Sequence, residues 1–328
     1  MVTFKAKSLL PLIILATIPL RADDGAASIA AGGVVVMKRE LRITMAKEVL
    51  QISGPKVIVD YDFRNDIDQD ITTEVAFPVP DYDHDLDREA RGASQRGFDD
   101  FQLWIDGVAT RCLVESRAFL KDTEYTNLLA GMQVDIASFG HAPEADRSPD
   151  IQRLSPTQRE QLEKLGLIDR DGGEPLWRVK KKYYWQQIFP AHKIVHIRHE
   201  YTPILGASNS IVYGMGPEPN ANSARELKSF CIDGRLHAIL QDVVDSKDRR
   251  ASYSYVDFIL TTANTWKTPI EDFTLIVERA YRRESLKDYV SFCWDGPVTK
   301  IDADHFSAHA VSLVPTRELR VGFFDVEE

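Results

Sequence analysis

Residues 194–201 alternate between a charged face and an apolar face, which is the pattern of a strand at the surface of a sheet. In an extended chain one face carries Ile194, His196, Arg198 and Glu200, and the other carries Val195, Ile197, His199 and Tyr201. We expect the first face to lie in solvent and the second to cover a core. Pro190 separates this run from another strand-like run that begins at Tyr183. Because proline cannot donate to a strand ladder, two strands are expected to meet there.

The chain before residue 121 also has the pattern of short strands with polar connections, which is typical of antiparallel sheets. Val57, Val59 and Tyr61 fall on one side of one such strand. Asp106-Gly107, between two further runs of strand-forming residues, predicts a two-residue hairpin with strands at 101–105 and 108–120.

The spacing of apolar residues changes to a helical period after Leu120. Asp122 is a suitable cap for a first helix, and Ser155-Pro156-Thr157-Gln158 forms a capping box for another. Beyond residue 176 the strand pattern returns. It is interrupted by a loop predicted over 206–223 and by one further helix over 233–247.

The expected fold is therefore mainly β: an antiparallel β-sandwich with a helical insertion and one further helix. We predict a single β-rich domain at residues 23–328. Its first β half spans 23–120, the helical insertion spans 121–175, and the second β half spans 176–328.

The first 22 residues have the composition of a signal peptide. Lys5 and Lys7 precede the apolar run Leu9–Leu20, which is too short to span a bilayer. Cleavage after Ala22 would leave Asp23 as the new terminus, while a later cleavage site and an uncleaved anchor are the alternatives. We therefore expect a periplasmic or secreted protein whose mature chain has no transmembrane segment.

The formal net charge of the chain limits the classes of partner that we expect. Removing Lys5, Lys7 and Arg21 with the leader changes the formal net charge from −10 to −13, which is −10 minus 3. An acidic chain disfavours nucleic acid and anionic membranes as partners.

Cys231 and Cys293 occur in nearly the same five residues, Phe-Cys-Ile-Asp-Gly and Phe-Cys-Trp-Asp-Gly. In an oxidising compartment this favours a Cys231–Cys293 disulfide, which would contribute about 4 kcal/mol in the chain-entropy model. The third cysteine, Cys112, is expected to be a buried thiol.

The residues that carry a family resemblance are spread along the chain. They are Asp23–Ala27 after the leader, then Trp185, Phe189-Pro190, His199, Tyr201 and Pro203, and finally Phe230-Cys231, Asn264–Trp266, Pro269–Phe273 and Ser291–Cys293. In this order they resemble the secreted bacterial family catalogued as the domain of unknown function DUF4424, over nearly the whole mature chain. The sequence departs from the pattern at Thr268, where a glycine is expected, and this affects a turn rather than chemistry. The resemblance implies export from a bacterial cell and one β-rich domain, and it implies no activity.

Two groups of residues are candidates for a metal site. His192, His196 and His199 crowd the central strand, but His199 points away from His196 and no compact zinc motif is present. We expect His199 to be a partly buried histidine that is hydrogen-bonded beneath the sheet instead. The alternating acids Asp81, Asp83 and Asp85 are weak candidates for calcium, and a solvated acidic loop is the favoured interpretation. No cofactor is predicted.

The candidates for a binding site are Tyr183, Trp185, His199 and Tyr201, which would line a ligand or peptide groove beside the insertion. Core packing is the alternative, since aromatic residues dominate β cores. Our first hypothesis is a non-catalytic exported protein that binds a small molecule, a peptide or an envelope component. The second is a hydrolase of an envelope polymer, with or without a metal. An enzyme should gather His199, acids and a polar partner in one open cleft.

Overall fold

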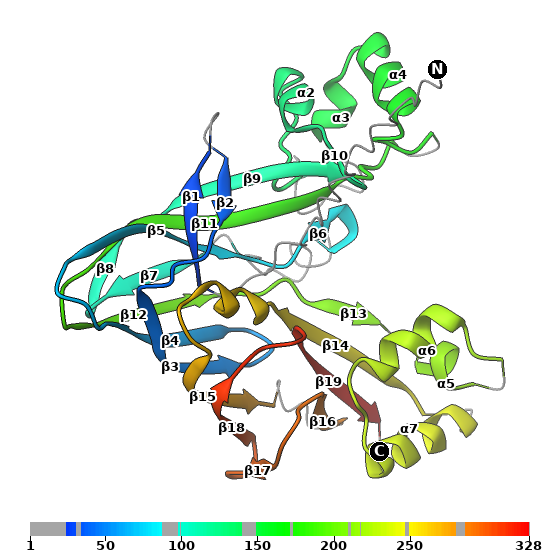
Figure 1. Ribbon diagram of the computed structural model, residues 1–328. Coiled ribbons are helices and arrows are strands. Elements are labelled where there is room, and N and C mark those ends of the chain that lie inside the picture. Colours follow the sequence, from blue (N-terminus) through cyan, green and yellow to red (C-terminus); the bar gives the residue numbers. More distant parts are fainter. Residues whose placement is uncertain are drawn as a thin grey trace, which may run out of the picture.

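The computed structural model describes residues 24–30, 34–86, 98, 100–139, 149–170, 173–208, 211–216, 218–246, 249–279 and 286–327. The predicted signal peptide, residues 1–22, lies outside the described residues. Three sheets and two groups of helices make up the described chain (Figure 1). Within the described residues, no helix is both long and apolar enough to cross a membrane.

The seven-stranded sheet has the order β10-β9-β11-β5-β1-β2, with β6 also pairing with β11. Its strands are β1 (Gly25–Ile29), β2 (Val35–Met37), β5 (Ile71–Pro78), β6 (Tyr82–Asp83), β9 (Leu113–Leu120), β10 (Thr123–Glu124) and β11 (Arg178–Phe189).

The eight-stranded sheet has the order β17-β18-β15-β3-β4-β12-β7-β8. Its strands are β3 (Ile43–Ile52), β4 (Val57–Asn65), β7 (Gln102–Ile105), β8 (Val108–Thr110), β12 (Ile194–Tyr201), β15 (Ile270–Glu278), β17 (Val298–Lys300) and β18 (His305–Leu313).

These two sheets pack face to face, and aromatic side chains fill the space between them. Phe63 of β4 meets Phe189 of β11 with ring centroids 5.8 Å apart, and Phe77 of β5 meets His199 of β12 at 5.0 Å. The alternation predicted for β12 is confirmed, because Val195, Ile197, His199 and Tyr201 are all buried. The expected mainly β, antiparallel sandwich is therefore confirmed.

The third, four-stranded sheet has the order β13-β14-β19-β16. Its strands are β13 (Gly206–Ser208), β14 (Ala251–Phe258), β16 (Leu286–Phe292) and β19 (Leu319–Glu327). Phe258 and Val321 belong to the main core, while Tyr253 and Phe324 of the same strands belong to a second core with α7. The sheet thus joins the sandwich to a layer of helices.

The helices form two separate groups (Figure 1). The insertion contains α2 (Thr126–Gly131), α3 (Pro149–Arg153) and α4 (Pro156–Leu165), drawn in green beyond β9 and β11. The four-stranded sheet is covered by α5 (Ile211–Met215), α6 (Ala221–Lys228) and α7 (Gly234–Asp245). A short 3-10 helix, η1 (Thr261–Thr265), precedes β15.

Several local predictions are confirmed. Asp106 and Gly107 both have positive φ angles, 49° and 78°, in the turn between β7 and β8. The capping box of α4 forms between Ser155 and Gln158. Asp233 caps α7 by accepting a hydrogen bond from the Leu236 amide.

Four local predictions were wrong. The predicted loop at 206–223 contains β13 and α5, so three helices follow β12 instead of one. Ile211 of α5 packs in the core of the helical layer. This packing overrides the weak helix propensity of the segment. The predicted strand 108–120 breaks at Cys112, because β8 and β9 belong to different sheets. Asp122 lies in the turn between β9 and β10, and α2 begins at Thr126. Finally, β3 and β15 pair in parallel, although antiparallel pairing was expected. Parallel pairing is possible here because a long stretch of chain, and not a hairpin, connects the two strands.

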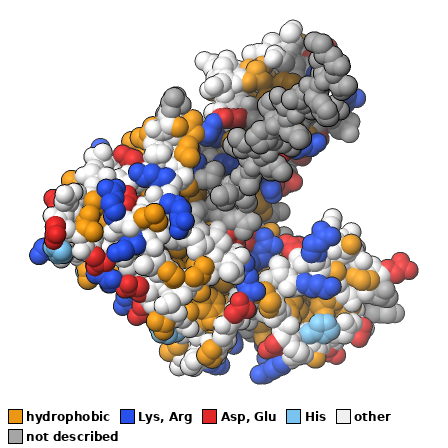
Figure 2. All heavy atoms as spheres, in the orientation of Figure 1, with side chains coloured by type: hydrophobic (Ala, Val, Ile, Leu, Met, Phe, Trp, Pro, Cys, Tyr) orange, Lys and Arg blue, Asp and Glu red, His pale blue; other side chains and the backbone are white. Residues whose placement is uncertain are grey.

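Figure 2 shows the surface of one face, on which Lys and Arg side chains lie among Asp and Glu side chains. The structure joins Cys231 and Cys293 by a disulfide, which links the turn after α6 to the end of β16. Cys112 is the one free thiol, and burial raises its pKa.

Candidate functional site

The four residues named as binding candidates all lie in the core. Tyr183 and Trp185 are each 4% exposed, Tyr201 is 1% exposed, and His199 is fully buried. Phe101 stacks on Tyr183 with ring centroids 4.1 Å apart, and the edge of Trp185 meets His199 at 5.5 Å. This placement favours the packing interpretation over an aromatic groove.

His199 has one acidic partner, and it lies far away in the sequence. Its Nε2 atom is 3.2 Å from Oδ2 of Asp24, and both side chains are completely buried. Trp266 Nε1 donates a 2.6 Å hydrogen bond to the Asp24 carbonyl oxygen. Burial raises the pKa of Asp24, and the nearby His199 opposes that shift. The pair ties β1 into the sandwich, and His199 occupies no open cleft.

An open depression lies instead on the other face of β12. It has a volume of about 330 Å³ and crosses β4, β12 and the β7–β8 hairpin. Its lining residues are Asp60, Tyr61, Asp62, Trp104, Gly107, His196, Ile197 and Arg198. The alternation of the strands explains the polar members of this set, because Asp60, Asp62, His196 and Arg198 lie between core positions and face outward, whereas Tyr61 and Ile197 are buried core residues between them.

Ionisable side chains are paired across the strands of this depression. Arg198 lies beside Asp60 in the ladder, and its Nη1 atom donates to both carboxylate oxygens, at 3.0 and 2.8 Å. His196 lies beside Asp62, and its Nδ1 atom is 2.5 Å from Oδ1 of that residue. The half-buried indole of Trp104 is next to Arg198 across the ladder on the other side.

The chemistry that these residues offer is hydrogen bonding and stacking. None of the described lining residues is a serine, threonine, cysteine or lysine, so the side chains that could act as a nucleophile or base here are the carboxylates of Asp60 and Asp62 and the imidazole of His196. The sequence had placed His196 and Arg198 on the solvent face. Trp104, Asp60 and Asp62 were missed, because only the register of the strands brings them to the same place.

A second depression, of about 400 Å³, lies where α7 approaches the end of β19. The side chain of Arg249 and the backbone of Arg250 make contacts within the fold. Arg249 pairs with Asp242 and donates to the Glu327 carbonyl oxygen, and the Arg250 amide donates to the Glu327 carboxylate. No aromatic residue lines it among the described residues, so we give it less weight as a ligand site.

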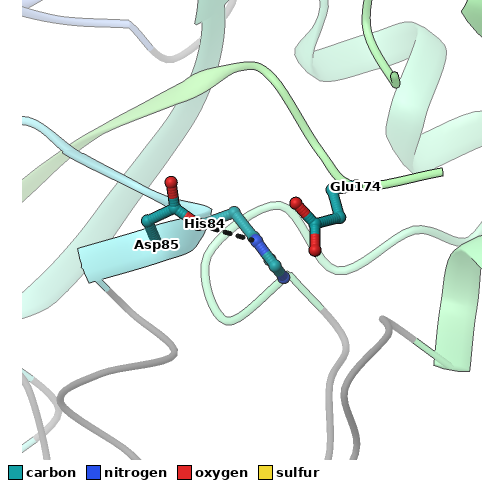
Figure 3. Close-up of side chains that lie close together, drawn as sticks. All are labelled: His84, Asp85 and Glu174. Atoms are coloured by element: carbon teal, nitrogen blue, oxygen red, sulfur yellow. Dashed lines mark ion pairs between the residues drawn. The ribbon is translucent and has the colours of Figure 1, made fainter. Parts of the chain in front are cut away.

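One cluster has the composition of a metal site (Figure 3). His84 and Asp85 follow β6, and Glu174 precedes β11. One possible ligand atom from each of the three lies within 4.8 Å of the others. His84 is buried, Glu174 is half-buried, and Asp85 is exposed.

The three aspartates suggested for calcium have separate environments. Asp85 belongs to this cluster, whereas Asp83 accepts a hydrogen bond from the Leu86 amide. The Asp81 carboxylate lies 3.9 Å from Lys180 Nζ, and burial raises its pKa. Glu174 was missed by the sequence analysis, because nothing in its local pattern indicates that it meets His84.

A comparison with family models shows to which protein family this chain is related. The model for the domain of unknown function DUF4424 matches residues 22–321. The chain belongs to the DUF4424 family. The resemblance seen in the sequence is thereby confirmed, and membership of DUF4424 assigns no activity. Among curated proteins, no significant match is found.

Solved structures show only distant similarity to this DUF4424 protein. A Legionella pneumophila protein whose suggested role is nutrient binding aligns at 12% identity and a TM-score of 0.40, over 87% of this chain and 68% of that chain. The M1 zinc metallopeptidase of Deinococcus radiodurans aligns at 8% identity and a TM-score of 0.26, over 87% of this chain and 43% of the peptidase chain. The chain thus spans less than half the length of the peptidase. At these TM-scores neither structure supports an argument about function.

Proposed function

We propose that this protein is an exported, non-catalytic binding protein that recognises a neutral saccharide of the cell envelope. The ligand occupies the depression on β4, β12 and the β7–β8 hairpin. The observation that carries the proposal is the position of Trp104 beside two cross-strand pairs of ionisable side chains, Arg198–Asp60 and His196–Asp62. The leader predicted at residues 1–22 supports export.

The charges of the depression favour a ligand without net charge. Asp60 and Asp62 contribute acids, while Arg198 contributes a permanent cation. An ionic ligand of either sign would be attracted by one of these groups and repelled by the other. A polyhydroxyl ligand can donate to the carboxylates and accept from the guanidinium, so both kinds of side chain are used.

Trp104 adds an apolar surface to this polar site. Binding sites for small molecules commonly combine aromatic walls with a few oriented polar groups. The C–H face of a sugar ring fits against an indole, while its hydroxyls reach the charged residues around it. An envelope polymer can cover a shallow depression with several units, which suits a site that is open to solvent.

The alternative function is hydrolysis of the same polymer, and one observation favours it. Asp62 holds the His196 ring through Nδ1, as an acid does when it orients a general base. Both carboxylates of the depression are already engaged, Asp60 by Arg198 and Asp62 by His196, and this supports binding instead.

The test measures binding of the purified chain, residues 23–328, to insoluble chitin and to soluble oligomers of N-acetylglucosamine, which are saccharides without net charge. We expect Trp104→Ala to weaken binding about 10- to 100-fold, since burying an aromatic side chain contributes about 1.5–3 kcal/mol. Arg198→Ala should weaken saccharide binding as well, because Asp60 then loses the guanidinium that holds its carboxylate.

The matched control is His309→Ala. His309 and Asp272 form another exposed cross-strand pair on the same sheet, with Nε2 2.9 Å from Oδ1, away from the depression. This variant should bind like the wild type. Equal binding by Trp104→Ala and the wild type would refute the proposal. Release of reducing ends that is lost in His196→Ala would favour the hydrolase.

A further inference from the structure

Three side chains from two distant segments converge at the end of the helical insertion. His84 and Asp85 follow β6, while Glu174 lies in the segment that leads from the insertion into β11. In Figure 3 the Glu174 carboxylate faces the His84 imidazole, and Asp85 lies on the other side of that ring. The His84 Nδ1 atom is 3.7 Å from Oδ1 of Asp85.

The backbone around this cluster is fixed by contacts outside it. Residue Asp83 pairs with Arg178 in the β6–β11 ladder, which places the two segments side by side. The Glu174 amide donates to Oδ1 of Asp169 at 2.8 Å, and the Asp169 amide donates back to the Glu174 carbonyl oxygen at 3.0 Å. The edge of the His84 ring meets Phe139, with ring centroids 5.8 Å apart.

The burial of the imidazole separates this cluster from an ordinary acidic patch. The His84 side chain is 3% exposed, although a carboxylate stands on each side of it. Within the described residues, no ion pair joins the Glu174 carboxylate to a lysine or arginine. The cluster therefore combines a buried imidazole nitrogen with two carboxylate oxygens at close spacing, and these are ligand types that a metal ion takes.

We propose that His84, Asp85 and Glu174 bind a zinc ion, with water completing the coordination. Zinc accepts imidazole nitrogen and carboxylate oxygen in four-coordinate sites. Calcium requires six to eight oxygen ligands, and the imidazole of His84 does not supply one. The proposed zinc site therefore takes a different ion from the calcium site considered for Asp81, Asp83 and Asp85, and Asp85 is the one residue that the two sites share.

The spacing of the ligands fits zinc with a small adjustment. Ligand atoms around one tetrahedral zinc ion lie about 3.5 Å apart, given bonds of about 2.1 Å. The observed limit of 4.8 Å requires the side chains to move inward by about an ångström. Asp85 has the freedom to do so, because its side chain is 72% exposed.

The bound ion would clamp the helical insertion to the β body. Its ligands come from the segment after β6 and from the end of the insertion, so zinc would connect the insertion to the β body directly. This site lies on different strands from the saccharide depression, so the two proposals stand independently. Trp104→Ala should therefore bind zinc like the wild type.

The experiment is calorimetric titration of chelator-treated protein, residues 23–328, with zinc chloride. We expect one zinc ion per chain. Asp85→Asn and Glu174→Gln should each weaken binding by at least about 10- to 100-fold, the range for losing an outer-shell partner. Glu163→Gln, a carboxylate on α4 of the same insertion, is the control and should bind like the wild type.

Cobalt provides a second measurement that does not depend on unfolding. Cobalt bound at the site should give visible absorbance that Glu174→Gln reduces and added zinc removes. The substitution of buried His84 can disturb folding, so the two carboxylate variants decide the result. The proposal is overturned if the wild type shows no saturable zinc binding, or if both carboxylate variants bind like the wild type. Tighter binding of calcium than of zinc at these residues would also overturn it.

Discussion

Histidine–aspartate pairs occur in this protein in two opposite environments. The His199–Asp24 pair is fully buried among aromatic rings, whereas His196 of the His196–Asp62 pair is 65% exposed. Both histidines belong to β12, and they differ only in the face of the strand on which they lie. The buried pair holds β1 in place, and the exposed pair shapes the depression.

Removing the acid from each pair should have very different consequences. Asp24→Ala leaves His199 buried without its partner, which should lower the free energy of unfolding by about 3–5 kcal/mol. Asp62→Ala breaks an exposed pair and should cost about 0–1 kcal/mol. Urea denaturation of both variants measures the difference. Equal losses would contradict a structural role for Asp24.

At the scale of elements, the alternation of β12 and the capping box of α4 were predictable because each depends on neighbours in the sequence. Loops were harder to predict. Asn220, in the segment expected to be irregular, is the N-cap of α6 and accepts hydrogen bonds from the Asn222 and Ser223 amides. The residues that suggest a loop are in this case the ones that begin a helix.

The candidate site was less predictable than the elements that form it. Its charged face on β12 follows from local alternation. Trp104 and Asp62 join that face through pairing with β7 and β4, which the sequence does not specify. In the same way, Glu174 meets His84 only because β6 pairs with β11. Long-range register decides both sites.

The disulfide connects the turn after α6 to the end of β16, and removing it measures how much this connection stabilises the fold. Cys231 and Cys293 close a loop with a sequence separation of 62, which corresponds to about 4 kcal/mol in the chain-entropy model. Replacing both cysteines by serine should lower the free energy of unfolding by about that amount. Mass spectrometry under non-reducing conditions should find these two linked and Cys112 alkylated. Alkylation of Cys231 and Cys293 without reduction would contradict the pairing.

At the scale of the whole molecule, the sandwich is a rigid support with two helical groups attached to it (Figure 1). The insertion and the α5–α7 layer leave uncovered the part of the eight-stranded sheet that carries the depression. The proposed saccharide site is therefore on the most regular part of the fold, where strand register sets each side chain. The proposed zinc site lies where the insertion joins that support.

The most direct test of this account is a crystal structure of the protein bound to an uncharged saccharide, an oligomer of N-acetylglucosamine. We expect a sugar ring against the indole of Trp104, with its hydroxyls within hydrogen-bond distance of Asp60, Asp62 or Arg198. A saccharide bound at another surface, with this depression empty, would contradict the central claim.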